Sequence, residues 1–164
     1  RFDTTTLSGV FMKYLALSTL LFISSASAQN QWLNASQMSD KAMETGDVLY
    51  MVGALQRCVA LQSLFGALVE KRAGEQEAGQ TYGMMAHRNF ANAYQINSMK
   101  EKSRGAGVST VESFVEATIV VMEEASNQYG TLITENQARD GDLIGRVIEV
   151  DLKTCTALYE GMLK

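Results

Sequence analysis

Residues 46–73 read GDVLYMVGALQRCVALQSLFGALVEKRA. The apolar residues of this stretch recur at steps of three and four, which is the spacing of one face of a helix. Glu70, Lys71 and Arg72 form a charged last turn, and Gly74 follows where glycine commonly ends a helix. The stretch therefore predicts a long amphipathic helix. Its apolar face comprises Val48, Val52, Leu55, Val59, Leu61, Leu64, Phe65 and Leu68.

The same spacing recurs in three later segments. The second predicted helix covers about residues 75–102. The third starts at Ser109, because Ser109 and Glu112 have the spacing of a capping box. The fourth starts near Asp142, a suitable N-cap residue. The predicted apolar faces are Tyr82, Met85, Ala86, Phe90, Ala93, Ile96 and Met99; Val111, Phe114, Val115, Thr118, Met122, Ala125, Tyr129, Leu132 and Ile133; and Ile144, Val147, Ile148, Cys155, Leu158, Tyr159 and Met162.

The order of these segments predicts an all-α fold. The chain has no proline, and short connections between long helices favour antiparallel neighbours. We therefore expect an up-down four-helix bundle, with room for a short extra N-terminal helix over about residues 37–43. Tetratricopeptide-type helix pairs are the alternative, but the predicted helices are about twice as long as such repeats use. Glycines inside the helices are expected to permit close helix approach or kinks. They are Gly53, Gly66, Gly83, Gly130 and Gly145.

Residues 12–28, MKYLALSTLLFISSASA, predict a secretory signal peptide. Met12 and Lys13 give a short positive start, and the apolar core that follows is shorter than the ~20 residues a membrane-spanning helix needs. The small residues before Gln29 match a cleavage site. We expect a periplasmic or secreted protein that keeps no stable membrane anchor after cleavage.

Three regions of the chain follow from this prediction. We interpret residues 1–11, which lack an initiator methionine, as an upstream or non-native extension. Residues 12–28 are the signal peptide, and residues 29–164 are a single helical domain. The chain has 14 basic and 18 acidic residues, of which Arg1, Lys13 and Asp3 precede the cleavage site. The domain therefore carries about five net negative charges and lacks the basic patch that nucleic acid requires, so we predict no nucleic-acid partner.

Cys58 and Cys155 are the only cysteines. An exported domain favours their oxidation, and equal heights in an antiparallel bundle would place them within one turn of each other. They predict a disulfide between the first and last long helices. A redox role is disfavoured, because the chain has no C-x-x-C pair and apolar surroundings raise the pKa of a thiol.

Few residues indicate catalysis or metal binding. His87 is the only histidine, and neither a haem C-x-x-C-H motif nor the Glu-x-x-His pairs of di-iron bundles occur. Met84, Met85 and His87 form the one local cluster that resembles a Cu(I) site. Methionine as core filler is the competing interpretation. We predict no cofactor and assign no catalytic residue.

Two other sets of residues have both a functional and a plain interpretation. The glutamates of the third helix could act as acid–base or Ca²⁺ groups, although a solvated helix face explains them better. The tyrosines could line a ligand pocket, although a core edge with hydroxyls in water is commoner. These residues are Glu112, Glu116, Glu123 and Glu124, and Tyr50, Tyr82, Tyr94, Tyr129 and Tyr159.

The sequence leads to two main hypotheses. The first is a non-catalytic binding or interaction protein of the bacterial envelope, with an envelope protein as its partner. The second is a carrier of a small ligand or a metal such as copper, held between helices. A hydrolase with an unrecognised site ranks below both, and the sequence sets no oligomeric state.

Overall fold

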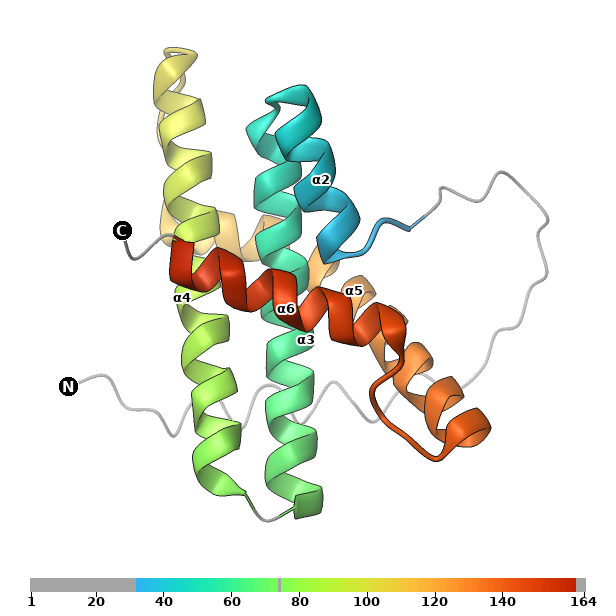
Figure 1. Cartoon of the computed structure of the whole chain (residues 1–164). Helices are drawn as coiled ribbons and strands as arrows, with labels where there is room; N and C mark the ends of the chain where they lie inside the picture. The colour runs from blue at the N-terminus through green and yellow to red at the C-terminus, as the bar shows by residue number, and fades with distance from the viewer. Residues whose placement is uncertain (1–31, 74, 162–164) are drawn as a thin grey trace, which may run out of the picture. The chain divides into compact units, whose positions relative to one another are not determined.

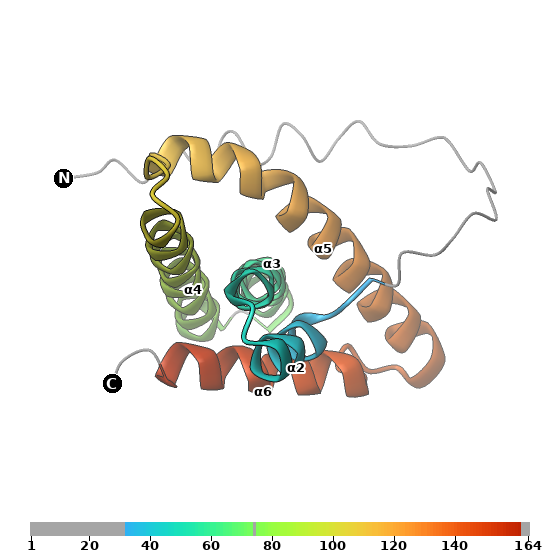
Figure 2. The same ribbon diagram turned by 90° about the horizontal axis from the view of Figure 1, so that it is seen from above.

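The long apolar segment forms the central helix of the fold. The computed structural model describes residues 32–73 and 75–161, and within them every regular element is a helix. Helix α3 contacts each of the other four, and Figure 2 shows it with α4, α5 and α6 around it. The fold is therefore all-α, as predicted, and its packing is compatible with a helical bundle. The helices are α2 (Ala35–Thr45), α3 (Val48–Ala73), α4 (Gln76–Ser103), α5 (Val111–Asp140) and α6 (Arg146–Gly161).

The short extra N-terminal helix is present and longer than predicted. Asn34 caps it: the Gln37 N–H donates to Asn34 Oδ1 at 2.9 Å, and the Asn34 N–H donates to Gln37 Oε1 at 3.0 Å. This reciprocal capping box places the start of α2 at Ala35. Gly46, with φ of 69°, ends the helix in the left-handed conformation that glycine adopts readily.

α3 and α4 approach each other closely near the turn that joins them. A Cβ on Gly66 would lie 3.0 Å from the Gly79 carbonyl oxygen and 3.1 Å from Tyr82 Cβ. The prediction that interior glycines permit close helix approach is confirmed at Gly66. At Gly83 and Gly130 a Cβ would meet no atom within 4 Å, so no close helix approach occurs at these two positions.

α5 packs onto this pair through an aromatic contact. The Phe114 ring lies 5.6 Å from the Phe90 ring and 5.5 Å from the Tyr94 ring, measured between centroids. Phe114 also belongs to the core cluster of Val52 and Leu55. Phe114 thus joins the N-terminal half of α5 to both α3 and α4. Figure 1 shows α6 crossing α3 and α4 rather than running alongside them.

Two predicted N-cap residues are wrong, by one residue for α5 and by three residues for α6. The N–H and hydroxyl of Ser109 both donate to the Glu101 carboxylate, so Thr110 caps α5 instead and accepts from the Ser113 N–H at 3.2 Å. α6 starts after Gly145, whose carbonyl accepts the first helical bond at 3.0 Å. The Asn136 side chain packs so closely on Gly145 that a Cβ there would overlap the Asn136 amide group.

One described helix, Val48–Lys71, is long and apolar enough to cross a membrane by length and composition. Just over half of its most apolar stretch is buried within the fold, as in the core helix of a soluble protein. The predicted signal peptide, the cleavage site before Gln29, the helix-ending Gly74 and the apolar Met162 lie outside the described residues.

Candidate functional site

The two cysteines meet where α6 crosses α3. Cys58 and Cys155 form a disulfide with their Cα atoms 5.3 Å apart, and both residues are fully buried. Ala35, the first residue of α2, packs in the same cluster. The structure pairs these cysteines as the sequence predicted. They meet because α6 crosses α3, and not because they lie at the same level on two helices that run side by side. Such a bond is consistent with an oxidising compartment.

A buried carboxylate lies one turn before this disulfide. Asp151 has no exposed surface, and its Oδ1 accepts from the Ser36 N–H at 2.9 Å. Its Oδ2 accepts from the Ala35 N–H at 3.1 Å and from the Tyr129 hydroxyl at 2.6 Å. Because a helix N-terminus has free N–H groups and a partial positive charge, it favours an anion. Asp151 of α6 thus holds the start of α2 against Tyr129 of α5.

Burial dominates the electrostatics of this cluster. Burial raises the pKa of Asp151, while its hydrogen bonds from Tyr129, Ser36 and Ala35 and the nearby Arg57 oppose that shift. The pKa of Tyr129 is raised well above its ordinary value by burial and by the Asp151 charge. Burial also lowers the pKa of the Arg57 guanidinium, which donates from Nε to the carbonyl of Leu33.

The Asp151 cluster is built to hold helices together. A carboxylate beside a phenol can transfer protons in an enzyme. Here both carboxylate oxygens already accept from groups of the fold, and Asp151 and Tyr129 lie in the core away from solvent. The sequence analysis missed Asp151. The signal was available, because Asp151 lies three residues after Ile148 and four before Cys155, on the apolar face of its helix.

The copper-like cluster is divided by the helix on which it lies. Met84 and His87 are exposed on α4, whereas Met85 is buried on the opposite side. Met84 and His87 line one open groove, and among the described residues no group of three or more His, Cys, Asp or Glu is placed to hold a metal. The groove is completed by Gln80, Gly83, Arg88 and Tyr159.

The tyrosines do not gather in one pocket within the described part of the chain. Tyr82 packs edge-on against Phe65, and the Lys41 ammonium lies 5.5 Å above the Tyr50 ring. Tyr94 donates to the Ser109 carbonyl at 3.0 Å. Tyr159 alone lines the groove on α4. The expectation that tyrosine hydroxyls lie in water is wrong for Tyr129, which is buried.

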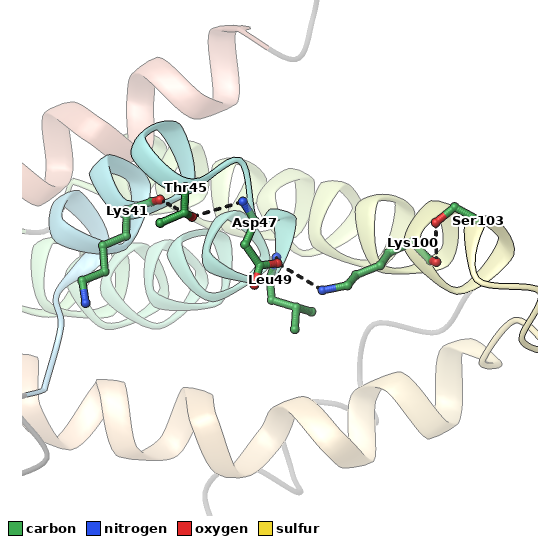
Figure 3. Close-up of polar contacts among 6 residues, drawn as sticks. All are labelled: Lys41, Thr45, Asp47, Leu49, Lys100 and Ser103. Carbon is green, nitrogen blue, oxygen red and sulfur yellow. Dashed lines mark hydrogen bonds and ion pairs between the residues drawn. The ribbon is translucent and has the colours of Figure 1, made fainter.

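Figure 3 shows a charged corner where α2, α3 and α4 meet. Asp47 Oδ1 accepts from the Leu49 N–H at 2.9 Å and from Lys100 Nζ at 3.1 Å. These two hydrogen bonds lower the pKa of Asp47. On the other side, Thr45 Oγ1 donates to the Lys41 carbonyl and accepts from the Asp47 N–H. The corner ties the end of α4 to the start of α3, which is a structural task.

Several apolar residues that the sequence assigned to the core are exposed. Val111, Val115 and Ile119 follow one another at four-residue steps on α5, and we call them the α5 row. Ile144, in the turn before α6, and Val147 and Val150 of α6 form the α6 row. Every member of both rows is 38–47% exposed. The predicted placement of Val111, Val115, Ile144 and Val147 in the core is therefore wrong.

The exposure has a geometric cause. α5 and α6 each bury one narrow side, which on α5 carries Phe114, Thr118 and Ala125. The apolar residues at the edge of that side extend beyond the reach of α3 and α4. The exposed glutamates Glu112, Glu116 and Glu123 border the α5 row.

No known protein family model matches this chain, and neither a curated protein nor a solved structure matches it. Among the described residues, the rows on α5 and α6 and the groove on α4 are surfaces open to a partner or ligand.

Proposed function

We propose that this protein is an exported, non-catalytic interaction protein of the bacterial envelope, and that it binds through the α5 and α6 rows. The observation that carries the proposal is the exposure of these rows. Single exposed apolar residues are ordinary on a protein surface. Apolar residues that recur on one side of a helix can form a continuous strip, and contiguous exposed apolar surface marks interaction sites.

The layout of the fold supports a binding role. The buried Asp151 carboxylate accepts hydrogen bonds from the start of α2 and from the Tyr129 hydroxyl. These buried polar groups therefore hold the described helices together. A disulfide fastens α6 to α3. The helices that display the rows are thus held by long-range links, and a rigid surface loses little conformational entropy when it binds.

Export is the second part of the proposal. It rests on the signal-peptide pattern of residues 12–28 and on the Cys58–Cys155 bond, which oxidising compartments permit. The periplasm is the compartment we propose, with secretion from the cell as the other destination of such a signal.

Site-specific photo-crosslinking in the exporting cell tests the binding role. A photoreactive residue replaces Ile119 of the α5 row in one strain and Asn127, exposed on the same helix outside the row, in another. We expect protein adducts from position 119 and none from position 127. Equal labelling at both positions, or none at position 119, would refute the proposed surface.

A small-ligand or metal carrier is the second candidate, and the groove on α4 favours it. Met84 and His87 are one turn apart, and a thioether and an imidazole are ligands that Cu(I) accepts. Titration of the metal-free protein with Cu(I) under reducing conditions tests it. Binding tighter than micromolar that Met84→Leu weakens and Met85→Leu does not would support the carrier, and weaker binding would end it.

A further inference from the structure

The two apolar rows are bordered by opposite charges. From residue 111 to residue 138 the chain contains five glutamates and no lysine or arginine. Glu116 and Glu123 are exposed beside the α5 row. Arg146 and Lys153 are exposed beside the α6 row. Each row is therefore complementary in charge to the other.

The spacing of these charges also matches. Glu116 and Glu123 are seven residues apart, and so are Arg146 and Lys153. Seven residues are about two helical turns, or roughly 10 Å. Two ion pairs, Glu116 with Arg146 and Glu123 with Lys153, can therefore form at once when the two helices lie side by side.

We propose that the α5 row of one molecule binds the α6 row of a second copy of this chain. Within one molecule both rows are exposed, so they do not cover each other. Two complementary surfaces that remain uncovered on one chain can be satisfied by a second copy of it. This inference rests on the proposed interaction surface and names its partner.

The side on which the charges lie sets the direction of the paired helices. Glu112 and Glu116 directly follow residues of the α5 row, whereas Arg146 directly precedes Val147 of the α6 row. Each residue advances about 100° around the helix axis. Viewed from the N-terminus of its own helix, the glutamates therefore lie on one side of the α5 row, and the basic residues lie on the other side of the α6 row. Such flanks face each other when the helices run parallel, as in coiled coils.

Competing contacts on each chain are weak. Lys153 Nζ lies 2.6 Å from Glu149 Oε1 one turn earlier on α6, and both side chains are more than half exposed. Exposed ion pairs at this spacing contribute little to stability. The Lys153 ammonium can therefore exchange Glu149 for a carboxylate of the second copy. Because the contact joins two different surfaces, repetition gives a closed ring or an open chain of molecules.

Sedimentation velocity of the purified exported protein over a range of concentrations tests this inference. We expect the wild-type mass to rise with concentration. Glu116→Lys/Glu123→Lys and Arg146→Glu/Lys153→Glu should each weaken association at least tenfold. The control Glu44→Lys/Glu135→Lys makes the same charge change as the first variant at exposed positions outside both rows, and should associate like wild type.

Combining the charge reversals tests whether the α5 row and the α6 row bind each other. A chain that carries all four reversals at the rows should self-associate again, and the two double variants, mixed together, should associate with each other although neither does so alone. Carbodiimide cross-linking between heavy- and light-isotope copies should join Lys153 to Glu123 rather than to Glu112. Circular dichroism confirms that each variant is folded.

Two outcomes overturn the inference. One is a wild-type protein that stays monomeric up to about 100 μM, a concentration far above typical specific dissociation constants. The other is a fourfold-reversed chain that stays monomeric while the wild type associates. A monomeric wild type whose position 119 still labels another envelope protein would end self-association and retain the proposed function, so the two failures are distinguishable.

Discussion

At the scale of single residues, Asp151 shows how one polar group can organise a helical core. It joins α6 to the first two N–H groups of α2 and to the Tyr129 hydroxyl of α5. The disulfide one turn away holds the same crossing. The apolar spacing predicted the buried face of α6, but a partner 115 residues away cannot be inferred from spacing, so the role of this aspartate required the structure.

The raised pKa of Asp151 predicts how stability depends on pH. Below the ordinary value of 3.8 the carboxyl is protonated in both folded and unfolded chains. As pH rises, the unfolded chain ionises first, so the stability contributed by the protonated group is lost as pH passes through the folded-state pKa. The free energy of unfolding of wild type minus that of Asp151→Asn should therefore fall as pH rises above 3.8.

Denaturant titration of both proteins between about pH 3 and pH 7 measures this difference. Other carboxylates, such as Asp47 and Glu101 with their lowered pKa values, contribute equally in both proteins, so their effect is removed by the subtraction. A difference that rises with pH would mean that the hydrogen bonds and Arg57 outweigh burial.

At the scale of helices, the chain's periodicity predicted α3 and α4 to within two residues at each end. The start of α6 was missed because Asn136, nine residues earlier in the chain, packs on Gly145 just before the helix, and such a tertiary contact leaves no local sequence pattern. The direction of α6 was missed for a related reason. A stripe of apolar residues specifies which side of a helix is buried, but not the angle at which the helix crosses its neighbours.

The close approach of α3 and α4 gives a paired prediction. Gly66→Ala would place a methyl group 3.0 Å from the Gly79 carbonyl, so it should lower the free energy of unfolding by about 1–3 kcal/mol. Gly83→Ala, one turn from Gly79 and in open space, should raise it by up to about 1 kcal/mol, because alanine favours the helix. Urea denaturation measures both, and equal effects would contradict a backbone contact at Gly66.

At the scale of the whole molecule, a disulfide fastens the helical domain, and such a bond is consistent with an oxidising compartment. The Cys58–Cys155 bond closes a loop with a sequence separation of 97 residues, a length at which the chain-entropy model gives roughly 4–5 kcal/mol of stabilisation. The disulfide could be predicted from the sequence, because the chain has two cysteines, both at apolar positions, and two cysteines allow a single pairing. The exposure of the rows could not be predicted, since periodicity does not show how much apolar surface the neighbouring helices can cover.

The proposed export predicts the covalent form of the protein in the cell. The intact mass of the protein taken from its own compartment should equal residues 29–164 minus two hydrogens, and reduction should restore those two. A mass that retains residues 12–28, or two free thiols before reduction, would contradict export with oxidation.

The folded chain does not need the apolar residues of the α5 row for its stability. The free energy of unfolding of Val115→Thr/Ile119→Thr, compared with that of Ile133→Thr in the buried part of the same helix, tests this statement. We predict that the double variant loses no more than about 1 kcal/mol, as surface changes do, while the single core variant loses roughly 2–4 kcal/mol. A double variant that loses as much as Ile133→Thr would place the α5 row in the core and contradict the account.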